Sequence, residues 1–205
     1  MTFVLDSPEV RALAAADPRL GELTRAAGPV DVDNDHDMFA SLARSITGQQ
    51  LSTRAASTIW GRLVDGGLVS PEAVLSAGPD DLRARGLSRA KAAYLADLAT
   101  HVLDGSLTES ALDALDDDAV VAELTRVKGI GRWTAEMFLI FSLGRPDVLA
   151  LDDAGLLRAA GWLLDLGGRS ATAAELAEAG EAWRPYRSVA SLYLWAALDR
   201  GRVPR

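Results

Sequence analysis

The chain has 205 residues, of which 49% are hydrophobic and 24% charged, and its formal net charge is −8. This length and apolar content suffice for one or two compact lobes with a buried core. Because the sequence has no cysteine, disulfides, thiolate zinc sites and iron–sulfur clusters are excluded. The two histidines, His36 and His101, lie too far apart in sequence to favour a histidine metal site.

The acidic balance argues against a protein that coats nucleic acid non-specifically, because phosphate neutralisation supplies most of that affinity. Acid is concentrated in two runs, which comprise Asp31, Asp33, Asp35 and Asp37, and then Asp113, Asp116, Asp117 and Asp118. A local basic face can coexist with such acidic flanks. No stretch approaches the length of a membrane span, and the first residues lack the features of an export signal. We therefore expect an intracellular protein with no membrane partner.

Helical periodicity runs along most of the chain, and alternating strand patterns are almost absent. The first predicted helix covers residues 8–15, and the next begins at Met38, after an Asp-rich segment. Further helices are predicted at 52–64, 71–76, 79–83, 88–103, 119–127, 133–143, 153–164, 173–182 and 185–198. Ser88 has the residue type and place of an N-cap.

These elements predict an all-α protein with two helical lobes and a cleft between them. Residues 1–36 are expected to form a helix and an acidic loop that pack on the C-terminal lobe. Residues 37–205 are expected to form the core, with a boundary between its two subdomains near 104–118.

A glycine turn separates the predicted helices 119–127 and 133–143. A tight turn at Gly129 and Gly131 needs a positive φ or a close backbone approach, which glycine allows most easily. The N–H groups at the start of the following helix suit a phosphate oxygen, and Lys128 and Arg132 add mobile positive charge. An ordinary helix C-cap followed by a loop has the same pattern, so this alternative stays open.

The residues from Leu124 to Ala135, with Asp152 and Asp153 beyond them, resemble the helix-hairpin-helix and catalytic loop of the helix-hairpin-helix DNA glycosylase superfamily. Two further segments, 46–52 and 183–195, agree with this resemblance. Their order and spacing from about Asp37 onward are similar to the alkylated-base branch, the 3-methyladenine DNA glycosylase II enzymes. The resemblance implies a helix-hairpin-helix fold with an active-site cleft.

Asp152 and Asp153 follow an apolar segment and precede a predicted helix, where the helix dipole favours an ionised carboxylate. From the sequence alone, N-capping is the better interpretation of either residue. With the resemblance, we assign capping to Asp152 and catalysis to Asp153. An ionised carboxylate can stabilise the cationic sugar that develops as an N-glycosidic bond breaks, and can orient the attacking water.

Relatives that also cut the DNA strand carry a lysine nucleophile at the position that Trp133 occupies here. Without that amine no Schiff base forms there, so we predict a monofunctional hydrolase that leaves an intact abasic site. The target base must be extruded into a pocket, and the resemblance implies that Trp133 and Trp195 flank it. On burial statistics alone, both tryptophans are better interpreted as core residues. Met137, one turn after Trp133, stands where many relatives carry an aromatic residue and suggests a roomier pocket.

The resemblance also implies the DNA contacts. Gln49, Gln50 and Leu51 match the loop that fills the space left by the flipped nucleotide, with Gln50 as the wedge. The same glutamines can instead simply join two helices. The DNA-binding residues expected at the hairpin are Lys128, Gly129, Gly131, Arg132 and Thr134. In the implied fold, the backbone carbonyls of Thr125, Val127 and Ile130 bind a monovalent cation, Na or K. No other cofactor is expected.

The sequence therefore predicts a DNA N-glycosylase that removes alkylated purines, such as 3-methyladenine and 7-methylguanine, from damaged double-stranded DNA in base excision repair. We expect a monomer in the bacterial cytoplasm, associated with the nucleoid. Two other classes stay open. A non-catalytic helix-hairpin-helix DNA-binding module has no need of Asp153 or an aromatic pocket, and a helical scaffold is suggested by the acidic charge and alanine content.

Overall fold

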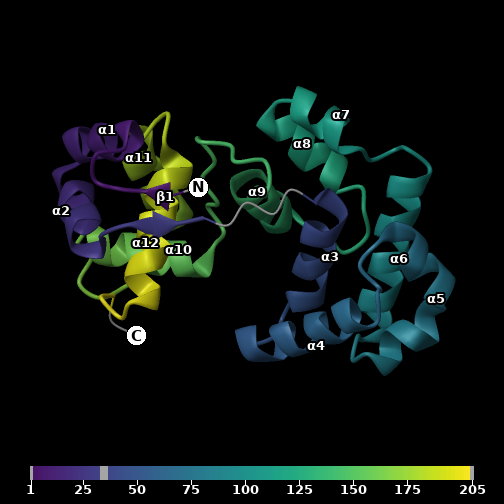
Figure 1. The fold of residues 1–205 in the computed structure, drawn as a ribbon. Helices are drawn as coiled ribbons and strands as arrows, with labels where there is room; N and C mark the ends of the chain where they lie inside the picture. The colour runs from purple at the N-terminus through teal and green to yellow at the C-terminus, as the bar shows by residue number, and fades with distance from the viewer. Residues whose placement is uncertain (1, 33–36, 204–205) are drawn as a thin grey trace. The chain divides into compact units, whose positions relative to one another are not determined.

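The computed structural model describes residues 2–32 and 37–203, and these residues form twelve helices and two short strands (Figure 1). The all-α prediction is confirmed. Backbone contacts divide the chain into two compact units. We call the described residues up to 32 together with 144–203 the terminal unit, and residues 37–143 the central unit. Asp33 and Asp35 of the first acidic run, and His36, lie outside the described residues.

The terminal unit is built from both ends of the chain. Its elements are β1 (Thr2–Phe3), α1 (Pro8–Ala16), α2 (Pro18–Ala27), β2 (Val30–Asp31), α10 (Ala154–Leu163), α11 (Ala173–Glu181) and α12 (Arg187–Asp199). The two strands pair antiparallel, with Thr2 opposite Asp31 and Phe3 opposite Val30. Helix α12 is buried along most of its length and contacts α1, α2 and α10, so it forms the centre of this unit.

Two of the long-range hydrogen bonds between the N-terminal segment and the C-terminal part of the chain come from fully buried aromatic side chains. The indole Nε1 of Trp183, a fully buried residue, donates to Oδ2 of Asp17 at 3.2 Å. The hydroxyl of Tyr193 donates to the carbonyl of Phe3 at 3.3 Å. Asp17 also accepts two hydrogen bonds from the guanidinium of Arg19, so its buried carboxylate is paired.

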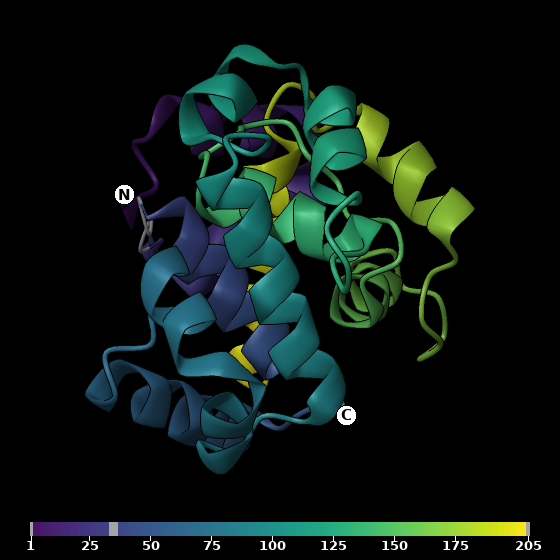
Figure 2. The same cartoon turned by 90° about the vertical axis from the view of Figure 1, so that its right-hand side faces the viewer.

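The central unit packs around α6 (Figures 1 and 2). Its elements are α3 (Met38–Gly48), α4 (Thr53–Asp65), α5 (Pro71–Ala84), α6 (Arg89–Leu103), α7 (Glu109–Ala114), α8 (Asp117–Leu124) and α9 (Arg132–Phe141). Ser88 caps α6, as predicted, by accepting the N–H of Lys91. The predicted helices 71–76 and 79–83 are one stretch, α5, broken at Gly78, where φ is 74°.

Three features differ from the predictions. Helices α2 and α7 were not predicted. The boundary between compact units falls at residues 143–144 rather than near 104–118, because α8 packs on α9 and stays with the central unit.

None of the helices in the described part of the chain is long and apolar enough to cross a membrane.

Candidate functional site

The hairpin between α8 and α9 has one glycine that its geometry requires. At Gly129, φ is +84°, and an added Cβ would lie 2.2 Å from Cδ2 of Tyr94. At Gly131, φ is −97°, and an added Cβ would meet nothing within 4 Å. The expectation that both glycines serve a positive φ or a close approach is therefore right for Gly129 and wrong for Gly131. Gly131 is instead the N-cap of α9, which has no side-chain cap.

Both cations of the hairpin are bound to carboxylates. Lys128 Nζ lies 2.8 Å from Oδ1 of Asp97, whose Oδ2 accepts the main-chain N–H of Lys128 at 2.9 Å. Burial acts to raise the pKa of Asp97, but the hydrogen bonds from Lys128 outweigh it and lower that pKa. The same hydrogen bond raises the pKa of Lys128. Arg132 pairs with Glu136 at 2.9 Å. The sequence indicated mobile positive charge here, and the structure corrects this to matched ion pairs.

The loop between α3 and α4 carries the predicted wedge. Gln50 is exposed, and its φ of 58° lies in the left-handed region, which few residues other than glycine adopt. Gln49 is half-buried, and its Nε2 donates to the carbonyl of Gly129 at 2.8 Å, which ties this loop to the hairpin. Leu51 is 40% exposed. The sequence-predicted loop and hairpin are thus brought together.

One face of α6 supports both of these segments. Lys91 Nζ donates to the carbonyls of Thr47, at 2.8 Å, and Gln49, at 2.6 Å. Burial lowers the pKa of this lysine. Tyr94 and Asp97 follow at helical spacing and contact the hairpin as described above. The sequence analysis missed these three residues because their spacing predicts that they share one face of a helix, but not which segments that face contacts.

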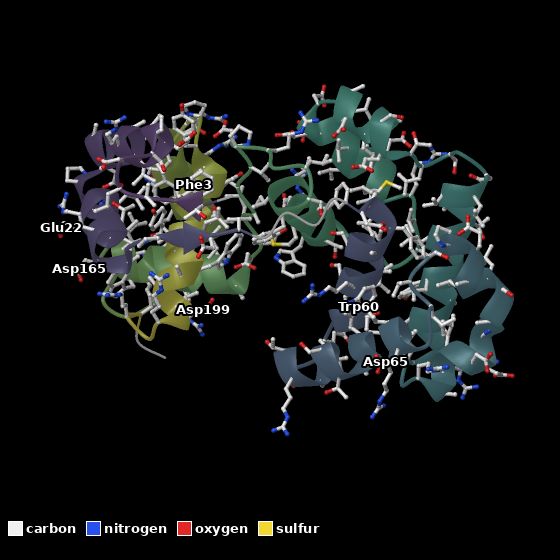
Figure 3. All side chains as sticks on the ribbon, viewed as in Figure 1. Phe3, Glu22, Trp60, Asp65, Asp165 and Asp199 are labelled. Carbon is white, nitrogen blue, oxygen red and sulfur yellow. The ribbon has the colours of Figure 1, made fainter. Side chains whose placement is uncertain are left out.

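A cavity of about 530 Å³ lies among α3, α4 and α9, wholly within the central unit. The predicted pocket residues Trp133 and Met137 line it together with Gln49, Gln50, Leu51 and Thr134. Trp133 is 42% exposed, whereas Thr134 is buried. Trp60 of α4, which is labelled in Figure 3 and which the sequence analysis did not single out, adds a second indole to the residues that line the cavity.

The candidate catalytic carboxylate lies in the terminal unit. Asp153 is the N-cap of α10, and its Oδ1 accepts the main-chain N–H of Leu156 at 2.5 Å. Asp152 lies in the preceding turn and is exposed. The assignment of capping to Asp152 was therefore wrong, because the extended backbone that precedes the helix falls at Asp153, where φ is −74° and ψ is 112°.

Trp195 touches this carboxylate. Its Nε1 donates to Oδ1 of Asp153 at 3.0 Å, and the residue is half-buried on α12. An added Cβ on Gly155 would lie 3.1 Å from the same oxygen and 3.7 Å from Cδ1 of Trp195, so this glycine leaves room for the pair. Trp195, predicted as a wall of the base pocket, contacts Asp153 and does not line the cavity of the central unit, and its place beside the base stays a prediction. Among the residues that the structure describes, no group of three or more His, Asp or Glu side chains is placed to hold a metal ion.

Comparison with known sequences gives a consistent result. Residues 43–185 match the family described as "HhH-GPD superfamily base excision DNA repair protein". The chain is 33% identical over 174 residues to "Putative DNA-3-methyladenine glycosylase YfjP" of Bacillus subtilis, which covers 80% of this chain and 60% of that protein. It is also 33% identical over 162 residues to "DNA-3-methyladenine glycosylase 1" of Schizosaccharomyces pombe, covering 77% of this chain and 71% of that protein. The chain thus spans less than two thirds of the first of these relatives.

Comparison with solved structures points to the same family as the comparison of sequences. A DNA-3-methyladenine glycosidase from Bacillus halodurans superposes with a TM-score of 0.86 at 44% identity and covers 96% of this chain and 92% of its own. The 3-methyladenine DNA glycosylase Mag1 from Schizosaccharomyces pombe, in complex with abasic DNA, has a TM-score of 0.82 at 28% identity, and covers 94% of this chain and 97% of its own.

Proposed function

This chain belongs to the HhH-GPD superfamily of base excision DNA repair proteins, and from that premise we propose that it is a DNA N-glycosylase that removes alkylated purines from duplex DNA. The relatives above carry names of 3-methyladenine glycosylases, one of them as putative, and the yeast enzyme Mag1 was solved in complex with abasic DNA, the product of base removal. The observation that carries the proposal is the carboxylate of Asp153, half-buried at the start of α10 and held by Trp195.

The chemistry assigned to Asp153 is electrostatic. As the bond between the sugar carbon and the base nitrogen breaks, its electron pair leaves with the base, and positive charge develops on the sugar. A nearby ionised carboxylate stabilises that charge, and water then adds its oxygen to the sugar carbon and loses a proton. An alkylated purine such as 3-methyladenine is already cationic in DNA, so it leaves as a neutral base and needs no acid to protonate it.

The remaining site residues are proposed to bind and distort the DNA. The N–H groups at the start of α9, capped only by Gly131, suit a backbone phosphate. Gln50, displayed by its left-handed backbone, fills the space of the flipped nucleotide. Trp133 and Met137 offer an indole face and a thioether to the extruded base, and an indole attracts a cationic ring.

The hairpin carbonyls of Thr125, Val127 and Ile130 are the groups that would hold a monovalent cation. Val127 already accepts the N–H of Ile130 at 3.1 Å within the turn, but a carbonyl oxygen has a second lone pair. The donor set therefore fits Na or K, which would reinforce the positive end of α9 toward a phosphate. No step of base removal passes through this ion.

The proposal is tested with duplexes that each contain one 3-methyladenine, 7-methylguanine, ethenoadenine or hypoxanthine. We expect excision of methylpurines, revealed by strand breaks only after alkali treatment. Because Trp133 stands in place of a lysine, borohydride should trap no covalent adduct. Binding without excision of any lesion would identify a non-catalytic DNA-binding module, and a protein that shows no binding and no excision would favour a scaffold. The lesion panel identifies the preferred substrate. Sedimentation of the protein measures its oligomeric state, for which we expect a monomer.

A further inference from the structure

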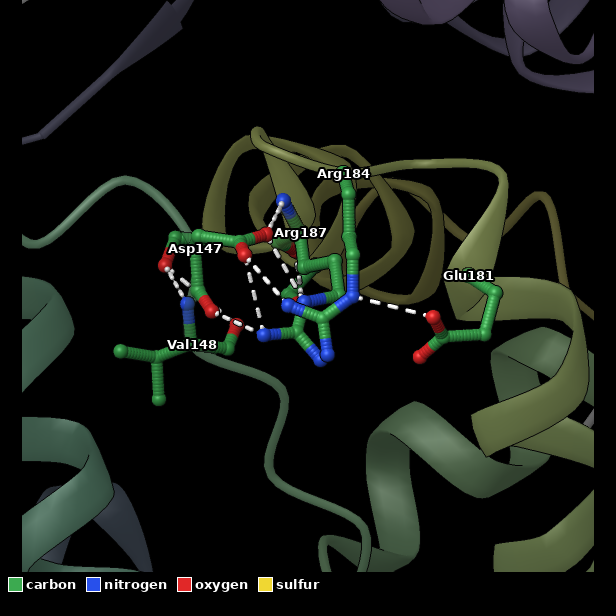
Figure 4. Close-up of polar contacts among 7 residues, drawn as sticks. Asp147, Val148, Glu181, Arg184 and Arg187 are labelled. Carbon is green, nitrogen blue, oxygen red and sulfur yellow. Dashed lines mark hydrogen bonds and ion pairs between the residues drawn. The ribbon is translucent and has the colours of Figure 1, made fainter. Parts of the chain in front are cut away.

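The first turn of α12 makes contacts that the proposed chemistry leaves unexplained. Arg187 is 17% exposed, and its guanidinium donates to both carboxylate oxygens of Asp147 (Figure 4). Nε donates to Oδ1 at 2.8 Å, and Nη2 donates to Oδ2 at 3.0 Å. Nη2 also donates to the main-chain carbonyl of Asp147 at 2.6 Å. Oδ1 of Asp147 in turn accepts the main-chain N–H of Arg187 at 3.3 Å, at a helix start where the side chain of the N-cap residue, Tyr186, makes no capping hydrogen bond.

The next residue of α12 extends this grip along the chain. Ser188 is buried, and its Oγ accepts the N–H of Val148 at 2.9 Å and donates to the carbonyl of the same residue at 3.3 Å. The N–H of Ser188 donates to the carbonyl of Pro146 at 3.0 Å. The main chain from Pro146 to Val148 is therefore fixed by two consecutive residues of one helix.

The segment held in this way is the one that leads to Asp153. In its middle, Leu149 lies against the backbone of Gly180, where an added Cβ would come within 2.5 Å of Cδ2 of Leu149. Ala150 is fully buried. At its far end, Asp153 is bound by Trp195, which also belongs to α12, about two helical turns after Ser188 and so on the same face. One helix thus contacts both ends of the segment 146–153.

We call the contacts of Arg187 and Ser188 with Asp147 and Val148 the clamp, and the charges of Arg187 and Asp147 favour a fixed geometry for it. Burial acts to raise the pKa of Asp147, but the hydrogen bonds and charge of Arg187, followed by the charge of Arg184, lower it below its ordinary value. The carboxylate thus stays ionised at neutral pH and paired with a planar guanidinium. Such bidentate pairs fix orientation as well as distance, which a lysine in the same place would not do.

We propose that the Asp147–Arg187 pair is a positioning pair that sets the carboxylate of Asp153 for base removal, with Ser188 as its second anchor. This inference rests on the proposed function of Asp153. Arg187→Ala removes the side-chain hydrogen bonds that fix Asp147 at the start of the segment 146–153. The carboxylate of Asp153 then departs from the geometry that the transition state needs. Because DNA contacts are proposed for the central unit, excision should fall while DNA binding does not.

The matched control is Arg184→Ala. Arg184 also pairs with Asp147, Nη1 to Oδ2 at 2.9 Å, but it is 47% exposed, and its other partner is the carboxylate of Glu181 at 3.1 Å (Figure 4). No hydrogen bond from Arg184 to the main chain of the segment 146–153 is present among the described residues. This variant therefore removes a charge from Asp147 without releasing the segment.

The experiment measures the single-turnover excision rate and the affinity for an abasic duplex in the full chain. We expect Arg187→Ala to lower the rate by about tenfold to a hundredfold with unchanged affinity, Arg187→Lys to recover part of the loss, and Arg184→Ala to leave both unchanged. An equal loss in Arg184→Ala, a loss of affinity in place of rate, or full activity of Arg187→Ala would overturn the proposal. If Arg187→Ala does not fold, Ser188→Ala gives the same comparison.

A second measurement needs no activity. The indole N–H of Trp195, identified by its disappearance in Trp195→Phe, gives a nuclear magnetic resonance signal that reports its hydrogen bond to Asp153. That signal should shift in Arg187→Ala and stay in place in Arg184→Ala, and an unmoved signal in both overturns the clamp. If the wild-type protein excises no lesion while the signal shifts as expected, the proposed function fails and the clamp stands.

Discussion

The indole Nε1 of Trp195 and the main-chain N–H of Leu156 both donate to Oδ1 of Asp153, at 3.0 Å and 2.5 Å. One carboxylate oxygen therefore caps α10 and holds a side chain of α12. The residue proposed to stabilise the sugar cation is also a structural residue of its unit, so variants of Asp153 must separate the two roles.

Asp153→Asn should abolish base excision and preserve the fold. Asparagine caps helices as well as aspartate does, so the free energy of unfolding should change by less than about 0.5 kcal/mol. The amide has no charge with which to stabilise a sugar cation, and binding to an abasic duplex should be retained. Asp153→Ala serves as the comparison, since loss of the cap should cost about 1 kcal/mol. Excision by the asparagine variant would remove Asp153 from the mechanism.

Gln50→Gly should separate backbone strain from the wedge. A residue other than glycine in the left-handed region is strained by about 1–2 kcal/mol, and glycine removes this strain. Glycine also stabilises the unfolded chain through its greater conformational freedom, which offsets part of the gain. We expect the free energy of unfolding to stay the same or rise by up to about 1 kcal/mol, while excision falls because nothing fills the vacated space. Gln50→Ala, which keeps the strain, should lose activity without gaining stability. Unchanged excision in both variants would refute the wedge.

Lys91→Met should weaken excision through the loop that displays Gln50. The substitution keeps the apolar stem but leaves the carbonyls of Thr47 and Gln49 without their ammonium donor, at a cost of about 1–3 kcal/mol in unfolding free energy. Single-turnover rates and thermal unfolding measure both effects. Arg89→Met removes a charge from an exposed position on the same helix and should change neither quantity. Equal effects of the two variants would mean that only the lost charge matters.

Gly129→Ala should be far more damaging than Gly131→Ala. The first places a Cβ within 2.2 Å of the Tyr94 ring at a φ of +84°, and should cost about 2 kcal/mol or more. The second adds a methyl group in open space at a helix N-cap and should cost less than about 1 kcal/mol. Chemical denaturation measures both. Similar costs would show that the close approach of Tyr94 does not constrain the hairpin.

Asp17→Asn should destabilise the protein in a pH-dependent way. Burial acts to raise the pKa of Asp17, but hydrogen bonds from Arg19 and Trp183 lower it overall. A depressed carboxyl pKa gives stability above the unfolded value, near 4, that disappears as the pH falls through the folded value. The variant should therefore be less stable by about 1–3 kcal/mol at neutral pH, with a smaller difference in acid. Asp80→Asn, at an exposed ion pair, should show no difference at either pH.

Much of the helical layout could be predicted because the caps and the apolar spacing are local. Helix α2 was not predicted because Gly21, three residues after Pro18, is typical of a segment that breaks a helix. In the structure an added Cβ on Gly21 would lie 3.2 Å from the Cβ of Ala14, so this glycine lets α1 and α2 approach closely. Helix α7 has only six residues, too few to establish a period.

The motif singled out Gln49, Trp133 and Asp153 as site residues, and their roles stay predictions. The contacts that Gln49 and Asp153 make with residues elsewhere in the chain were not predicted. Asp97 neutralises Lys128 from a helix 31 residues earlier, a pairing that no local pattern specifies. The choice between Asp152 and Asp153 as the cap depended on a single residue of helix register, which sequence patterns fix least well.

The terminal unit joins the two ends of the chain, and this imposes an order on its folding. On a ribosome, α1 and α2 emerge long before α12, by roughly 8–30 s at ordinary rates of synthesis. During that interval α1 and α2, which carry the buried residues Leu13, Leu20 and Leu23, can pack on each other but lack α12, which contacts both in the folded protein. Residues 37–143 emerge as one uninterrupted stretch and can pack first. The nascent N-terminal helices therefore wait for a packing partner while the central unit is synthesised, and the core of the terminal unit forms only after α12 has emerged.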